Sequence, residues 1–431
     1  MADIQVSPVA DNVSATGSSG SRVDVWTTHL IGYSFYVRSN VGANGSIYYV
    51  KTTDGGETWS SSTKVNSTTE EANATNQWSV YYDQWTPGIT TTLIHIAWLE
   101  RISNAFGYLA PTKYRALQTS DDSLGTEVQL FTSDCSSGLC GSASSGESPS
   151  MVRARGGNLY LWHRAGPGVA DQWRFYRSVD SGATWTERAK RPGTATVIQP
   201  KLLPGGESDS NDILLIATRA SAISYWIYDD SADSWTDSGT VDTSGFGSAI
   251  EAEGATRKSD NNTFVAYMMK NADSTHTLRI IEITTGVSFT QRTNLFADEA
   301  GHDTTPRNQV AVALDAVSAS DIYVGYGGTV ADTTQQGFKK STDGAVTWGA
   351  QQTFGEDSVT SRTGIFLAMN TSAVGGRIYG TWQQGPSVDI LGNFNTSIAL
   401  QASGGSGNYP SQMHNKRARK SERRIQGLRV P

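Results

Sequence analysis

Short apolar segments separated by polar turns recur along the chain, and this pattern predicts strands rather than helices. One kind of segment mixes apolar and polar residues, and the other, which precedes it, is almost continuously apolar, as in residues 93–99, 159–163 and 264–269. The continuous segments are predicted to be buried between neighbouring sheets. Seven copies of the mixed segment occur, at residues 47–52, 114–119, 173–178, 224–229, 278–283, 336–341 and 396–401. Each interval has room for a four-stranded unit.

An eight-residue pattern follows three of the mixed segments, and we call these three copies the Asp–Trp turns. The pattern predicts a hairpin turn in which the Asp carboxylate accepts backbone N–H bonds, Gly takes a positive φ angle, and Trp covers the apolar interior. Weaker versions occur at Asp121, Asp230 and Gly286. The defining residues are Thr52, Asp54, Gly56 and Trp59 in the first copy, Ser178, Asp180, Gly182 and Trp185 in the second, and Ser341, Asp343 and Trp348 in the third.

The Asp–Trp turns resemble the Asp-box, or BNR, repeat of sialidase-like β-propellers. This resemblance implies an all-β propeller of four-stranded antiparallel blades, with each turn joining the third and fourth strands on the face opposite the active site. The seven copies favour seven blades, and a ring of six with one irregular unit is the alternative. Residues 3–8 resemble the fourth strands elsewhere and are expected to complete the last blade, closing the ring without a free sheet edge.

Composition agrees with many short strands joined by turns, since the 431 residues include 44 Gly and only 17% are charged. We expect one propeller domain over residues 1–409 and a basic arm over residues 410–431. The formal net charge is −7, so the propeller itself is acidic. The arm is expected to dock onto an acidic protein surface, with a solvated tail and a nucleic-acid contact ranked below. Its basic residues are Lys416, Arg417, Arg419, Lys420, Arg423, Arg424 and Arg429.

A basic residue ends the second strand of five successive repeats, which predicts an arc of positive charge on the face opposite the Asp–Trp turns. Arginine binds carboxylate, sulfate or phosphate through its planar fork. The alternative is that these residues pair with acidic neighbours across blades. The candidate ligand face comprises Arg38, Arg101, Arg164, Arg219 and Lys270, with Arg307 and Arg362 at the entries to first strands and the carboxylates of Glu251 and Glu253 nearby.

The resemblance supplies no catalytic residue. The sialidase-like enzymes use three arginines, a Tyr–Glu pair and an Asp, and their first arginine lies in an Arg-Ile-Pro motif, whereas Arg38 is followed by Ser39 and Asn40. Glu251 and Glu253 are two apart on one predicted strand and are a weaker candidate for the two carboxylates of a glycoside hydrolase. The six histidines are scattered, and no cofactor or metal is expected. Cys135 and Cys140 either form a disulfide or remain free thiols.

The first 12 residues lack the features of a secretion signal, and no apolar run is long enough to span a membrane. Together with the basic arm and the missing catalytic set, this favours a non-enzymatic component of a virus or bacteriophage particle. Such a protein would lie on a virion or cell surface, dock through its termini and present the opposite face to glycans. The alternatives are a secreted sialidase-like hydrolase or lectin and an intracellular scaffold.

Overall fold

The computed structural model divides the chain into two compact units, Met1–Ile398 and Ala399–Pro431, and every described residue belongs to the first. Cys135, Cys140 and the basic arm lie outside the described residues. The structure describes residues 4–5, 24–28, 30–41, 44–67, 72–73, 78–82, 91–99, 102–104, 107–109, 112–130, 149–164, 173–191, 198–206, 210–219, 222–242, 248–257, 259–271, 273–284, 288–299, 310–314, 320–327, 336–354, 362–367, 378–384 and 389–395.

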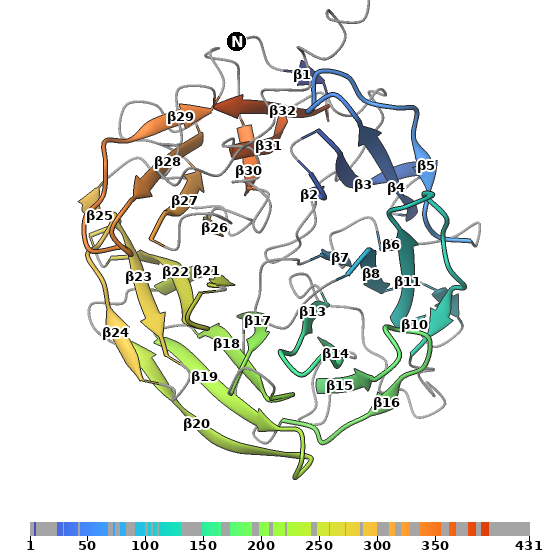
Figure 1. Cartoon of the computed structure of the whole chain (residues 1–431), viewed down its shortest axis with the longest axis horizontal. Coiled ribbons are helices and arrows are strands. Elements are labelled where there is room, and N and C mark those ends of the chain that lie inside the picture. The colour runs from blue at the N-terminus through green and yellow to red at the C-terminus, as the bar shows by residue number, and fades with distance from the viewer. Residues whose placement is uncertain are drawn as a thin grey trace, which may run out of the picture. The chain divides into compact units, whose positions relative to one another are not determined.

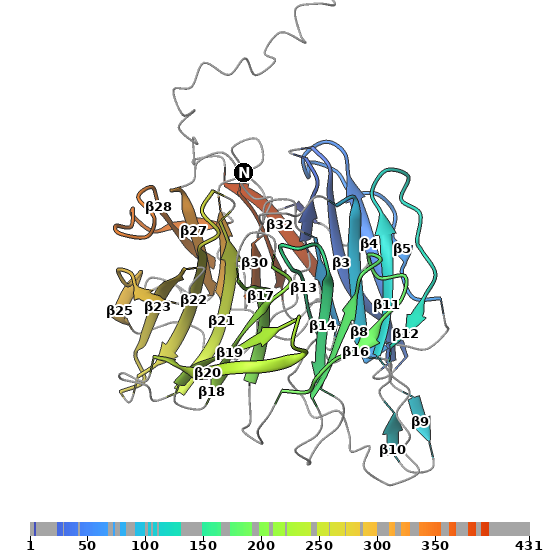
Figure 2. The same ribbon diagram turned by 60° about the horizontal axis from the view of Figure 1, so that its bottom comes forward.

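All regular elements in these ranges are strands, and they form seven antiparallel sheets of four or five strands, numbered here in chain order. The first sheet contains β2 (Asp24–Trp26), β3 (Gly32–Val41), β4 (Asn44–Thr52) and β5 (Thr63–Lys64), with β6 (Ala72–Asn73) pairing β4. The second contains β7 (Trp78–Tyr81), β8 (Leu93–Leu99), β11 (Thr112–Gln118) and β12 (Val128–Gln129). A separate hairpin consists of β9 (Ile102–Asn104) and β10 (Gly107–Leu109), and it projects beyond the second sheet (Figure 2).

The next four sheets follow the same order. The third contains β13 (Ser150–Arg153), β14 (Leu159–Arg164), β15 (Trp173–Ser178) and β16 (Thr186–Glu187). The fourth contains β17 (Ile198–Pro204), β18 (Ile213–Arg219), β19 (Ala222–Asp229) and β20 (Ser234–Asp242). The fifth contains β21 (Ser248–Thr256), β22 (Thr263–Lys270), β23 (His276–Ile283) and β24 (Phe289–Gln291), with β25 (Phe296–Glu299) pairing β23. The sixth contains β26 (Val310–Leu314), β27 (Ile322–Gly327), β28 (Gln336–Ser341) and β29 (Gln352–Phe354).

The seventh sheet combines both ends of the propeller sequence. It contains β30 (Arg362–Leu367), β31 (Ile378–Gln384), β32 (Asp389–Asn395) and, as its fourth strand, β1 (Ile4–Gln5). Ile4 lies opposite Gly392 and Gln5 opposite Leu391, which is the pairing expected for residues 3–8. The third strand was predicted at residues 396–401, and this is wrong: residues 389–395 pair along the whole of β31. Their Gly and Asn content, which lowers strand propensity, made residues 396–401 the stronger sequence pattern.

The sheets surround a common axis, with the first strand of each innermost (Figure 1). Consecutive first strands contact one another in the series β7, β13, β17, β21, β26 and β30. The predicted β-propeller of four-stranded blades is confirmed. Apolar clusters fill the spaces between sheets: one joins the second, third and fourth sheets around Trp162, and another joins the fifth and sixth around Phe264. The second strands are continuously apolar because both of their faces are buried in this way.

The Asp–Trp turns have the geometry that their sequence predicts. In the second copy the Ser178 hydroxyl donates to Asp180 Oδ1 at 2.8 Å and accepts the N–H of Gly182, whose φ is 97°. Asp180 also accepts the N–H and hydroxyl of Thr184, at 2.8 and 2.5 Å. These hydrogen bonds from Thr184 and Ser178 lower the pKa of Asp180 to about 2. Corresponding bonds occur in the copies that begin at Thr52 and Ser341.

Candidate functional site

The basic residues predicted for the ligand face lie at the sheet edge opposite the Asp–Trp turns. In the first sheet Thr52, where the turn begins, lies opposite Gly32 at one end of the hairpin, and Arg38 lies opposite Ser46 towards the other. Residues at the same end of their hairpins are Arg164 opposite Trp173, Arg219 opposite Ala222, Lys270 opposite His276, and Arg362 opposite Gln384. We call the positions of Arg38, Arg164, Arg219, Lys270 and Arg362 the basic edge.

The backbone fixes these positions, but only one side chain of the basic edge is described. Lys270 is partly exposed. Arg101 and Arg307 lie outside the described residues, as does the side chain of Glu251. Ligand binding by this set therefore stays a prediction.

A polar cavity lies among the first strands of four consecutive sheets, β7, β13, β17 and β21. At its centre Lys201 and Glu253 form an ion pair between the fourth and fifth sheets, and their side chains are only 6% and 8% exposed. The cavity is lined by Ser79, Val80, Ser150, Met151, Lys201, Leu202 and Glu253. Burial of the pair limits screening by solvent, so each charge depends on the other.

Two serines complete the polar part of this cavity. Ser150 Oγ accepts the N–H of Leu202 at 3.0 Å, which leaves its own hydroxyl hydrogen free to donate. Ser79 is 3% exposed, and its Oγ has no hydrogen-bond partner among the described residues. Such a buried hydroxyl is costly unless a water or ligand atom satisfies it.

Glu253 was among the residues predicted from the sequence for the ligand face, whereas Lys201 was not predicted. Glu253 was expected on the ligand face together with Glu251, whereas its described partner is a lysine from a neighbouring sheet. Glu251 and Glu253 lie on β21 opposite Met268 and Ala266, and the geometry of the predicted carboxylate pair is not tested. One signal could have identified Lys201: it is the only charged residue in the strand Ile198–Pro204.

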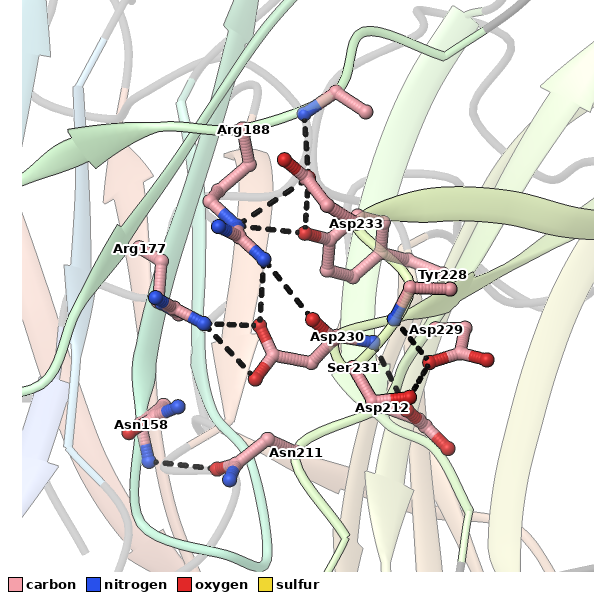
Figure 3. Close-up of polar contacts among 12 residues, drawn as sticks. Asn158, Arg177, Arg188, Asn211, Asp212, Tyr228, Asp229, Asp230, Ser231 and Asp233 are labelled. Atoms are coloured by element: carbon pink, nitrogen blue, oxygen red, sulfur yellow. Dashed lines mark hydrogen bonds and ion pairs between the residues drawn. The ribbon is translucent and has the colours of Figure 1, made fainter.

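A second polar group, drawn in Figure 3, joins the third and fourth sheets at the edge of the turns. Arg177 Nη1 lies 2.8 and 3.1 Å from the two carboxylate oxygens of Asp230. Arg188 donates to Tyr228 Oη at 2.9 Å and to the Asp230 carbonyl at 3.0 Å, and Tyr228 donates to Asp233 at 2.7 Å. Cation and carboxylate neutralise each other throughout, so this network stabilises the weakened turn at Asp230 and holds the two sheets together.

A buried histidine links the second and third sheets. His95 is fully buried, and its Nε2 lies 3.3 Å from Arg153 Nη2, which can only donate. His95 Nδ1 must then carry the proton and donate to Tyr114 Oη, 2.7 Å away, and the Tyr114 hydroxyl can donate to the Ser181 carbonyl at 3.3 Å. Burial, with a smaller contribution from the Arg153 charge, lowers the pKa of His95 to about 3. We interpret this cluster, in which a neutral His95 lies beside the charged Arg153, as part of the packing between sheets.

The described residues contain no group of three potential metal-ligating side chains. No helix in the described part of the chain is long and apolar enough to cross a membrane.

Comparison with known proteins identifies the fold. No protein-family model matches the chain. No curated protein matches it either. Among solved structures, an ulvan lyase of a new polysaccharide lyase family superposes with a TM-score of 0.54 at 11% identity, over 90% of this chain and 95% of the other. The shared fold is thus a β-propeller, and at this identity the likeness extends to the fold alone.

Sialidase propellers are more distant matches. The intramolecular trans-sialidase of Ruminococcus gnavus has a TM-score of 0.45 at 12% identity, over 93% of this chain and 99% of the other. The NanB sialidase of Streptococcus pneumoniae has a TM-score of 0.44 at 10% identity, over 90% of this chain and 70% of the other.

Proposed function

We propose that this protein is a saccharide-binding β-propeller that recognises anionic glycans through its basic edge. The observation that carries the proposal is the recurrence of a cation at the same end of the second strand in several sheets, as in Arg164, Arg219 and Lys270. Positions repeated around a propeller axis lie at the same edge of successive sheets, where several cations could act on one ligand. Carboxylate and sulfate groups suit arginine, whose planar fork makes paired hydrogen bonds to two oxygens.

A structural neighbour supports the choice of ligand. The ulvan lyase was solved bound to -[GlcA(1-4)Rha3S]-, a saccharide with a carboxylate and a sulfate. In this chain the sequence offers no match to the catalytic residues of the sialidases, so the proposal is for binding. Turnover on the same saccharides is the second candidate, and the overlap of fold with a lyase is the observation that favours it.

Binding can be measured by calorimetry on a panel of sialyllactose, oligogalacturonate and chondroitin sulfate tetrasaccharide. We expect at least one anionic saccharide to bind, with an affinity that falls as salt increases. Arg164→Ala and Arg219→Ala should each weaken binding about 10-fold, the value of one charge-assisted hydrogen bond of about 1.5 kcal/mol. Lys190→Ala is the matched control, because Lys190 is exposed on the segment after β16 and outside the basic edge.

Three results would decide against this proposal. They are a wild type that binds no saccharide of the panel, a loss of affinity in Lys190→Ala as large as that in Arg164→Ala and Arg219→Ala, and an affinity that does not depend on salt. Cleavage of a panel member with release of an unsaturated or reducing end would instead support an enzyme. The virion role and the docking of the basic arm remain predictions. Deleting residues 414–431 and comparing the proteins captured by both forms tests the arm separately.

A further inference from the structure

We propose that the cavity around Lys201 and Glu253 is a subsite for one uncharged hydroxyl group of the saccharide. This deepens the proposed function and rests on it, because it takes the ligand to be a glycan. The basic edge would bind the anionic groups, and the cavity would bind a hydroxyl of the same ligand.

The charge of the cavity selects against ions. An entering carboxylate or sulfate would be attracted by the ammonium of Lys201 but repelled at close range by the Glu253 carboxylate. A cation would be attracted by Glu253 and repelled by Lys201. Both costs are large here because the side chains are almost fully buried. An uncharged group with a donor and an acceptor avoids both costs.

The hydrogen-bonding groups match a hydroxyl. The ammonium of Lys201 has three N–H donors, and Glu253 occupies one direction only. Ser150 has a free hydroxyl hydrogen, and the buried Ser79 Oγ has no partner among the described residues. A ligand hydroxyl can accept from the ammonium or Ser150 and donate to Glu253 or Ser79, which satisfies a group that is otherwise costly to bury.

The size of the cavity limits what can enter. Its volume is about 20 Å³, which is enough for one water-sized group, and it is partly open. A sugar ring does not fit within it, so the ligand would insert a single hydroxyl and keep its ring outside. In the free protein a water molecule would take the same place.

Ser79→Ala tests the subsite with little risk to folding, because it removes one oxygen from a position without a protein partner. We expect about a 3- to 10-fold loss of affinity for the panel saccharide that binds the wild type, the equivalent of one hydrogen bond between uncharged groups. The slope of affinity against salt should not change. Ser224→Ala is the matched control, since Ser224 is equally buried, its Oγ also lacks a partner in the described structure, and it lies on β19, away from the cavity.

The double variant Lys201→Met/Glu253→Met gives a second test. Removing both charges leaves neither unpaired, so the melting temperature should stay near that of the wild type while affinity falls 10-fold or more. Unchanged affinity in the double variant would show that the pair is purely structural, whatever the melting temperature.

The results separate this inference from the proposed function. Unchanged affinity in Ser79→Ala and the double variant, with a loss in Arg164→Ala, overturns only the subsite. A loss in Ser79→Ala with none in Arg164→Ala supports the subsite and overturns the basic edge. Failure of the wild type to bind any panel saccharide overturns both.

Discussion

Gly182 should not accept a side chain, because Tyr114 of the neighbouring sheet occupies the adjacent space. A Cβ atom on Gly182 would lie 2.0 Å from Tyr114 Oη and 2.3 Å from Cζ. Tyr114 cannot easily withdraw: it is 2% exposed, its hydroxyl is bonded to His95, and its ring packs edge-on against Trp185 with centroids 5.0 Å apart. The φ of 97° at Gly182 adds a backbone cost for any residue with a Cβ.

The two costs can be separated by a matched glycine. A positive φ costs an alanine about 1–2 kcal/mol, and overpacking of a full interior adds about 1–3 kcal/mol. Gly182→Ala should therefore destabilise by about 2–5 kcal/mol. Gly157 has a φ of 101°, and a Cβ atom there would meet no other atom within 4 Å, so Gly157→Ala should show only the backbone cost. Ala345 stands at the equivalent turn position of the sixth sheet with a φ of 66°, so an alanine fits where the neighbouring sheet leaves room.

Urea unfolding followed by tryptophan fluorescence measures both variants. If overlap with Tyr114 is the cause, Gly182→Ala should cost less in a Tyr114→Ala background, and the two substitutions should not add. Equal losses for Gly182→Ala and Gly157→Ala, or strictly additive losses in the cycle, would refute the reasoning.

Three further predictions concern pH and the chain ends. The pKa of Asp180 is about 2, against an ordinary 3.8, so its charged form stabilises the fold above pH 4 and this stability is lost as pH falls towards 2. Asp180→Asn should therefore be less stable than the wild type at pH 7 and equal to it near pH 2. A difference in stability that does not depend on pH would contradict this. The pKa of His95 is lowered from 6.5 to about 3, so between these pH values the unfolded chain binds a proton that the folded protein does not. The free energy of unfolding should therefore fall from pH 6.5 towards pH 3 by at most about 1.4 kcal/mol per pH unit. His95→Gln should remove that slope in urea titrations, and an identical slope in both proteins would contradict the prediction. Deleting residues 1–9 removes β1 and exposes the edge of β32, so the melting temperature should drop in calorimetry, and unchanged melting would exclude a stabilising role for this pairing.

The fold could be predicted because its signals are local. A turn such as Ser178–Trp185 forms its hydrogen bonds within eight residues, so its sequence alone specifies its geometry. The order of strands within a sheet follows, since successive strands of a propeller are neighbours. The last sheet was harder: residues 389–395 contain Gly and Asn, and pairing with β31 outweighs their weak propensity.

The site could be predicted only where it repeats. Cations at the ends of second strands recur with the sheets, so Arg164, Arg219 and Lys270 were found by their spacing, and the strand register places them at one edge. Lys201, in contrast, does not belong to the set of cations that recurs at the ends of second strands. Its significance comes from contact with Glu253 across the space between two sheets, and no pattern within either strand encodes that distance.

The same contrast explains why the cavity is the better indicator of specificity. Repeated cations are a product of the fold's periodicity, and their charge alone would attract any polyanion. Lys201, Glu253, Ser79 and Ser150 come from four different sheets and break the repeat, at a position where burial makes unpaired polar atoms costly. Replacing a buried ion pair with apolar residues of similar volume is often neutral or stabilising, so stability alone does not require the pair. In the subsite that we propose, the ion pair and the Ser79 Oγ, which has no partner among the described residues, would therefore be the groups that recognise a particular hydroxyl.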